Sequence, residues 1–214
     1  MKNVLIYYGT REGQTAKISE CIAQTLADSG FGAHLVGADE RSWKFAGDEY
    51  AGVVLGGAVH YGKFPKEFRR EVLANRSDLT KVPCAFFSVC LGVLEKDNPE
   101  TQAAEKKIVS DFLAEARLSP ALVDIFPGGI RYSEYGWLKR RILRSIARKA
   151  GVETRFDRNY DFTDWERVRR FARAFAETLA CAEESFREFP RSFSASSRSS
   201  AAFFGGAPAR TPTD

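Results

Sequence analysis

The fold is decided by the stretch Gly9-Thr10-Arg11-Glu12-Gly13-Gln14-Thr15, which separates an apolar run at residues 4–8 from a helical pattern. A strand, a short loop and a helix start together form a site for a phosphate, because the first N–H groups of a helix lack partners and carry partial positive charge. We expect the two glycines to let the backbone come close, the two threonines to donate hydroxyl hydrogen bonds, and Arg11 to add charge. The alternative is an ordinary strand-to-helix turn with a threonine N-cap.

Composition indicates one domain with a substantial core. The chain has 214 residues, of which 44% are hydrophobic and 13% aromatic, with a net charge of +4. The four cysteines show no CxxC spacing, and two histidines are few additional ligands, so we expect reduced thiols and neither a metal site nor a disulfide framework. No apolar run approaches the roughly 20 residues that span a bilayer, and the N-terminus does not have the pattern of a signal peptide. We therefore expect a cytoplasmic protein.

Strand and helix patterns alternate along the chain. The spacing of Ile18, Ile22 and Leu26 predicts an amphipathic helix after the turn, ending near Ser29. Apolar segments predict further strands at residues 33–36, 52–57, 83–89 and 121–126. Helices are expected at residues 66–74, at 101–117 and from 163 onward, where Thr163 and Glu166 have capping-box spacing. The expected buried faces comprise Ala104, Ile108, Phe112 and Leu113 in the second of these helices, and Val168, Phe171, Ala172, Phe175 and Leu179 in the third.

This alternation predicts an α/β fold, a three-layer sandwich around a five-stranded parallel sheet. With the phosphate turn after the first strand, the flavodoxin-like order 2-1-3-4-5 fits, and the ligand then lies at the carboxyl ends of the strands. We expect this domain to occupy residues 1–184. Residues 185–214 are expected to form a disordered tail, because serine, alanine, arginine, glycine and proline dominate them without periodicity.

The phosphate turn favours a mononucleotide. It has neither the GxxxxGK[ST] pattern of a triphosphate loop nor the GxGxxG pattern of a dinucleotide site. A monophosphate held by N–H groups and hydroxyls fits better, as in FMN.

Two further loops are expected to face a flavin ring. After the third strand, Gly56, Gly57 and Ala58 would let the backbone approach the ring, and Tyr61 would stack on it. His60 is the one candidate for a catalytic proton donor, and an ordinary exposed loop histidine is the alternative. After the fourth strand, the backbone would supply N–H groups, and we interpret Cys90 as a packing residue rather than a nucleophile. The expected ring-facing residues are Ala58, Val59, His60, Tyr61, Gly62, Ser88, Val89, Cys90, Leu91 and Gly92.

A basic helical insertion is expected after the fifth strand, at about residues 131–158. It holds nine basic and three acidic residues, so its net charge exceeds that of the whole chain. An apolar stripe of Leu138, Ile142, Ile146 and Ala150 follows Trp137. Such a helix can lie on an anionic membrane or attract a polycarboxylate, and a solvated helix docked on the core is the alternative. The residues expected to contact substrate or membrane are Trp137, Lys139, Arg140, Arg141, Arg144 and Arg148.

With these loops placed, the sequence closely resembles the flavodoxin-like, menaquinone-dependent protoporphyrinogen IX dehydrogenases of bacteria. The matching stretches are residues 10–15, Tyr61-Gly62, residues 85–89, Gly129-Ile130-Arg131-Tyr132 and Thr163-Asp164-Trp165-Glu166. One departure is His60-Tyr61-Gly62, where the family has Arg-Tyr-Gly.

The resemblance implies an FMN enzyme of haem biosynthesis that oxidises protoporphyrinogen IX and passes the electrons to menaquinone or ubiquinone. Thr10, Arg11, Glu12, Gly13, Gln14 and Thr15 would hold the FMN phosphate. The Gly129–Tyr132 loop, with Arg131 and Tyr132, would border the ring. The insertion would serve the substrate, the quinone or the inner face of the cell membrane, where the protein would be peripheral.

Other functions stay open at this point. A flavodoxin-type electron carrier is disfavoured by a sequence pI of about 8.9, because such carriers are usually acidic. An NAD(P)H:quinone reductase of the same fold would show no obvious motif, and a membrane or nucleic-acid adaptor would use the basic helix alone. We do not expect a nucleic-acid partner, and a homo-oligomer is left open.

Overall fold

The computed structural model describes residues 3–38, 45–46, 49–94, 98–130 and 160–188. Five parallel strands form one sheet in the order β2-β1-β3-β4-β5, as predicted. They are β1 (Asn3–Gly9), β2 (Ala33–Gly37), β3 (Tyr50–Ala58), β4 (Cys84–Val89) and β5 (Leu122–Phe126). β4 is buried along its whole length, because neighbouring strands and helices on both faces exclude water from it.

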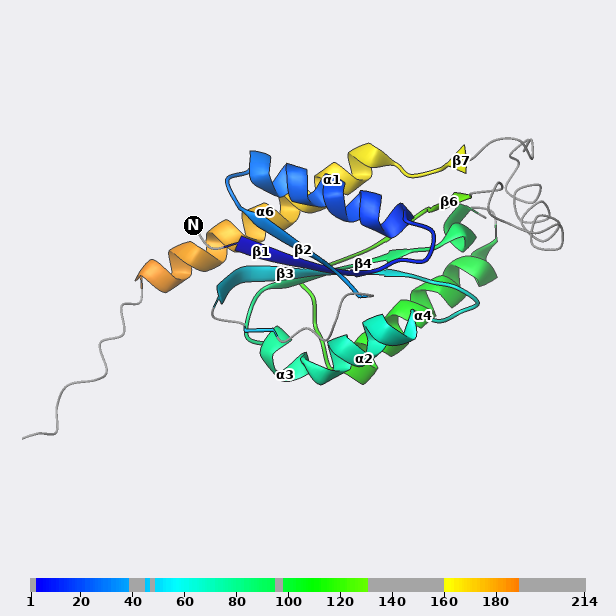
Figure 1. The fold of residues 1–214 in the computed structure, drawn as a ribbon, viewed down its shortest axis with the longest axis horizontal. Coiled ribbons are helices and arrows are strands. Elements are labelled where there is room, and N and C mark those ends of the chain that lie inside the picture. The colour runs from blue at the N-terminus through cyan, green and yellow to red at the C-terminus, as the bar shows by residue number, and fades with distance from the viewer. Residues whose placement is uncertain (1–2, 39–44, 47–48, 95–97, 131–159, 189–214) are drawn as a thin grey trace, which may run out of the picture.

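Helices cover both faces of this sheet and make the three-layer sandwich (Figure 1). One layer contains α1 (Gln14–Asp28) and α6 (Trp165–Glu188); the other contains α2 (Lys66–Ala74), the short α3 (Arg76–Leu79) and α4 (Pro99–Ala116). A 3₁₀ helix, η2 (Leu91–Leu94), follows β4, and neither η2 nor α3 was expected from the sequence. Among the described helices, none combines the length and apolar character needed to cross a membrane.

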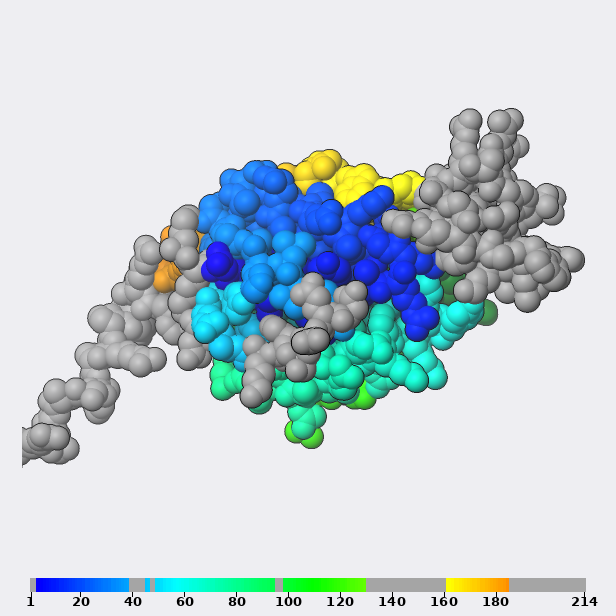
Figure 2. All heavy atoms as spheres, viewed as in Figure 1, coloured from blue at the N-terminus to red at the C-terminus, as the bar shows by residue number. Residues whose placement is uncertain are grey.

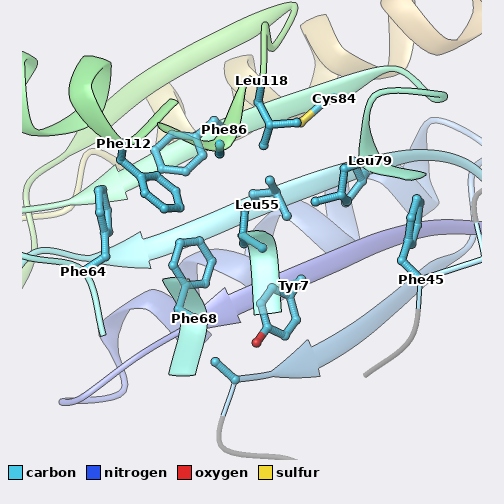
Figure 3. Packing of buried hydrophobic residues seen from close by; sticks show 14 of the residues in the cluster. Tyr7, Phe45, Leu55, Phe64, Phe68, Leu79, Cys84, Phe86, Phe112 and Leu118 are labelled. Atoms are coloured by element: carbon cyan, nitrogen blue, oxygen red, sulfur yellow. The ribbon is translucent and has the colours of Figure 1, made fainter. Parts of the chain in front are cut away.

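Each face of the sheet has its own hydrophobic core. On one face, Ile18, Ile22 and Leu26 of α1 are fully buried, as their spacing predicts. The predicted apolar face of α6, from Val168 to Leu179, is buried in the same cluster. On the other face, the ring of Phe112 in α4 packs against the rings of Phe86 in β4, Phe68 in α2 and Phe64 just before α2 (Figure 3).

The buried face of α4 differs from the expected one. Ala104 is exposed, while Val109, Phe112 and Ala116 are buried. Ile108 and Leu113 pack against the same core, so only Ala104 of the expected stripe is wrong. α4 begins at Pro99, and its N-cap is Asn98, whose side chain accepts a hydrogen bond from Thr101 N.

A small two-stranded sheet lies outside the main sheet. β6 (Gly129–Ile130) pairs antiparallel with β7 (Tyr160–Asp161), and both lie at the carboxyl end of the sheet (Figure 1). The expected helical insertion at 131–158 lies outside the described residues. β6 immediately precedes it, and β7 follows it. α6 continues to Glu188, past the domain end expected at residue 184, and the rest of the expected tail also lies outside the described residues.

Candidate functional site

The site is built at the carboxyl end of the sheet, where β1 and β3 lie side by side and their following helices go to opposite faces. This divergence separates the loops after the two strands and makes the position at which α/β sheets of this kind bind ligands. The blue atoms of the β1–α1 region meet the cyan-green atoms of the segment after β3 on the surface in Figure 2. The loops after β4 and β5 end at the same edge.

The turn after β1 is shaped by Gly13 and Thr10. Gly13 has φ 78°, a left-handed conformation that glycine adopts without strain, and α1 begins at the next residue. Gly13 N donates a hydrogen bond of 2.9 Å to Thr10 Oγ1. Among the residues that the structure describes, no side chain caps α1, so the threonine N-cap that we considered is absent and the first N–H groups of the helix face the loop.

Thr15 carries an unsatisfied hydroxyl in the first turn of α1. The residue is 1% exposed, and among the described residues its Oγ1 has no hydrogen-bond partner. A buried hydroxyl without a partner costs about 1–3 kcal/mol. A phosphate bound at the helix N-terminus would give this hydroxyl a hydrogen-bond partner. Arg11 is exposed beside this turn and can add charge.

The side chains of Gln14 and Glu12 contact other residues of the protein and are not available to a phosphate. Gln14 Nε2 donates to Asp161 Oδ1 at 2.9 Å and to Thr163 Oγ1 at 2.8 Å. Glu12 Oε1 lies 3.7 Å from His60 Nε2. A carboxylate would also repel a phosphate, so both residues can offer the phosphate only their backbone N–H groups.

His60 therefore lies beside the phosphate turn, in contact with Glu12. The His60–Glu12 contact joins the loop after β3 to the loop after β1, and both side chains are mostly buried. Since an imidazole beside a carboxylate can exchange protons, His60 stays the candidate proton donor.

Tyr61 stands at the tip of a tight turn. His60 N donates to Lys63 O at 2.9 Å, and Lys63 N donates to His60 O at 3.1 Å. Tyr61 and Gly62 between them have φ 50° and 74°, the signs of a type I′ turn. The Tyr61 side chain is 83% exposed, so a large ring is held in solvent on a strained backbone at the ligand edge.

Three glycines expected to face the ligand make room for aromatic rings. A Cβ on Gly9 would lie 2.8 Å from Phe68 Cβ, and a Cβ on Gly57 would lie 2.6 Å from Phe64 Cδ1. A Cβ on Gly56 would collide with the ring of Phe87. These glycines are therefore needed for close packing inside the protein, and their role in letting the backbone approach a ligand stays a prediction.

Two backbone N–H groups in the loop after β4, which we expected to be available to the ligand, already have partners within the protein. Cys90 N donates to Phe126 O at 3.0 Å, and Gly92 N lies 3.4 Å from Cys90 Sγ, so these two amides are engaged within the protein. Ser88 is fully buried within the sheet beside Gly57, and its Oγ has no partner among the described residues. Ser88 stands one residue before the carboxyl end of β4, so its place beside the flavin stays a prediction, and Leu91 and Gly92 in η2 are half-buried.

Cys90 is a packing residue. Burial raises the pKa of its thiol well above the ordinary value, and the neighbouring Glu105 carboxylate raises this pKa further. Because the thiolate is the reactive form, the thiol stays protonated and inert, which supports the interpretation made from the sequence.

The ends of the insertion join the site through residues that the sequence did not single out for this role. Asp161 and Thr163 contact Gln14, and Thr163 Oγ1 donates to Pro127 O at 3.2 Å. The predicted capping box does not form, since Asp164 Oδ1 accepts from Arg167 N and Glu166 pairs with Arg169. The Thr-x-x-Glu pattern therefore predicts the start of a helix correctly, but its side chains do not make the hydrogen bonds of a capping box. The remaining expected site residues, Arg131, Tyr132, Trp137, Lys139, Arg140, Arg141, Arg144 and Arg148, lie outside the described residues.

Comparison with known proteins first defines the class. Residues 5–157 match the Flavodoxin domain family. A solved short-chain flavodoxin associated with a bacterial microcompartment shares the fold, with a TM-score of 0.51 and 13% identity over 84% of this chain and 99% of that one. The cofactor that a flavodoxin domain implies is FMN, and the unsatisfied Thr15 hydroxyl at an uncapped helix N-terminus fits its phosphate.

Closer relatives then define the family. Protoporphyrinogen IX dehydrogenase [quinone] of Escherichia coli (strain K12) is 32% identical over 80% of this chain and 93% of its own length. The protein of the same name from Leishmania major is 35% identical over 80% of this chain and 74% of its own length. The chain therefore belongs to the flavodoxin-like protoporphyrinogen IX dehydrogenase family.

Proposed function

We propose that this protein is an FMN-dependent oxidoreductase that converts protoporphyrinogen IX to protoporphyrin IX and passes the electrons to a membrane quinone, menaquinone or ubiquinone. The observation that carries the proposal is the likeness to the quinone-linked dehydrogenase of Escherichia coli over 93% of its length, together with a buried hydroxyl that lacks a partner among the described residues at the predicted phosphate turn. The reaction removes six electrons and six protons from the porphyrinogen in three two-electron steps, and three quinones become quinols.

The cradle would hold FMN through few side chains. Thr10, Thr15 and Arg11 would contact the phosphate, and residues 12–14 would contribute N–H groups. FMN, when bound, supplies the acceptor for two electrons at each step. The protein then has to position the porphyrinogen against the ring, exclude water and accept the released protons.

The loops beside the cradle would border the ring. Tyr61 is exposed at the tip of its turn and would cover one face, with η2 on the other side. His60, held against Glu12, would exchange protons with substrate at the ring edge. Arg131 and Tyr132 follow β6 directly, so they would enter the same edge of the site.

The basic insertion would bring the flavin to its partners. Its ends, β6 and β7, stand at the ligand edge, and residues 131–158 carry a net charge of +6. Such a segment complements both the two propionates of the substrate and an anionic membrane, where the quinone is found. We infer peripheral attachment to the inner face of the cell membrane, through Trp137, Lys139, Arg140, Arg141, Arg144 and Arg148.

Anaerobic turnover tests the function. Porphyrin fluorescence should grow only when protoporphyrinogen IX, the FMN-loaded protein and a menaquinone analogue are all present. Formation of quinol from NADPH with no porphyrinogen requirement would favour the NAD(P)H:quinone reductase. Flavin that cycles only with a protein partner would favour the electron carrier.

Vesicle flotation tests the attachment. Charge reversal at Arg140, Arg141 and Arg144 should abolish binding to anionic vesicles. The matched control reverses Lys17, Lys106 and Arg170, which are exposed on α1, α4 and α6 and carry the same total charge. Equal loss of binding in the two variants would show that overall charge, rather than the insertion, governs attachment.

A further inference from the structure

The amide of Gln14 joins three distant parts of the chain. Gln14 opens α1 directly after the phosphate turn and is 8% exposed. Its Nε2 donates to Asp161 Oδ1 at 2.9 Å and to Thr163 Oγ1 at 2.8 Å, so both amide hydrogens are used. These partners lie 147 and 149 residues further along the chain.

The same cluster holds both ends of the segment 131–159. On the returning end, Thr163 N donates to Asp161 Oδ1 at 2.9 Å. On the leaving end, Thr163 Oγ1 donates to Pro127 O at 3.2 Å, and Phe162 N donates to Gly128 O at 3.3 Å. The Thr163 hydroxyl therefore accepts a hydrogen bond from Gln14 in the phosphate turn and donates one to Pro127, which precedes β6. This one hydroxyl links the phosphate turn to both β6 and β7.

Burial makes this connection stiff. Gln14 and Thr163 are both buried, and the hydrogen bond between them has little competition from water. Loss of either partner would leave the buried amide or hydroxyl with one hydrogen bond fewer, which is costlier than loss of an exposed pair. A displacement of the first turn of α1 must therefore be transmitted to β6 and β7, or the bonds must break.

We propose that Gln14 is a positioning residue that couples the FMN phosphate cradle to the two ends of the basic segment, rather than a ligand of the phosphate. Binding of the phosphate fixes the first turn of α1, and the Gln14–Thr163–Asp161 bonds then fix β6 and β7 beside the flavin. The connection is reciprocal, so that ordering of β6 and β7 tightens FMN binding. The inference rests on FMN binding at this turn and does not depend on which substrate is oxidised.

Hydrogen exchange of the apoprotein and the FMN-loaded protein tests the coupling. In the wild type, FMN should slow exchange both at the phosphate turn and at residues 129–130 and 160–163. Riboflavin, which has no phosphate, should protect the second group much less. In Gln14→Leu, FMN should still protect the turn, but its protection of β6 and β7 should disappear, and FMN binding should weaken at least about fivefold.

Three further variants separate coupling from a general loss of structure. Gln24→Leu removes an exposed amide hydrogen bond to Asp28 on the same helix and should behave as the wild type. Asp161→Asn keeps an acceptor oxygen and should preserve the FMN-dependent protection. Thr163→Val should lose this protection, and it replaces Gln14→Leu as the test if that variant does not fold. Equal protection of β6 and β7 in the wild type, Gln14→Leu and Thr163→Val would overturn the coupling alone. Failure of the wild type to bind FMN would overturn the proposed function as well.

Discussion

Replacement of Thr15 by valine should move stability and cofactor affinity in opposite directions. Valine has nearly the shape of threonine and removes only the buried hydroxyl, which lacks a partner among the described residues. Removal of an unsatisfied buried polar group should stabilise the apoprotein by about 1–3 kcal/mol. The holoprotein loses a hydrogen bond to a charged phosphate, worth about 1.5–3 kcal/mol, so FMN should bind about 10- to 150-fold more weakly.

Urea denaturation of the apoprotein measures the first effect, and quenching of FMN fluorescence measures the second. Riboflavin affinity should stay the same, because only the phosphate contact is lost. Thr25→Val is the matched control: Thr25 Oγ1 already donates to Cys21 O at 2.8 Å, so this change should destabilise the apoprotein and leave FMN affinity unaltered. A Thr15→Val protein that is less stable and binds FMN like the wild type would refute the assignment of Thr15 to the phosphate.

Three other changes test single features of the structure. Gly57→Ala places a Cβ 2.6 Å from Phe64 Cδ1 and should cost about 1–3 kcal/mol in urea denaturation; no loss would mean that the ring is not packed there. Tyr61→Gly relieves a positive φ and should stabilise the apoprotein by about 1 kcal/mol while weakening flavin binding, and a loss of stability would argue against the strained turn. Burial raises the pKa of Cys84 to about 12 from 9.0, so the folded chain keeps a proton that the unfolded chain releases above pH 9.0. The stability advantage of the wild type over Cys84→Ala should therefore shrink from pH 9.0 toward 12 by about 1.4 kcal/mol per pH unit, and a constant difference would contradict the shift.

Elements with a strong local pattern could be predicted from the sequence. α2 begins and ends at the predicted residues, and β4 matches its apolar run within one residue. The sheet order follows from the alternation of strands and helices with a phosphate turn after the first strand. These features depend on neighbours in sequence, whose periodicity is visible in the letters.

The side-chain partners in the site could not be predicted in this way. Gln14 looked like a phosphate residue, but its partners are about 150 residues away and no periodic signal connects them. Gly9 and Gly57 looked suited to a ligand, although the rings that fill their space come from the segment after β3. The exposed Ala104 shows the same limit, since the helical period that correctly places Ile108, Phe112 and Leu113 on the core does not show where along α4 that core ends.

The most direct test of the account is the first half-reaction in the absence of oxygen and quinone. The FMN-loaded protein is mixed with protoporphyrinogen IX in a stopped-flow instrument, and the absorbance of oxidised flavin is followed. The proposed function predicts bleaching of the flavin as porphyrinogen is oxidised, followed by recovery of the absorbance when a menaquinone analogue is added. Flavin that stays oxidised with protoporphyrinogen IX in excess would contradict the account.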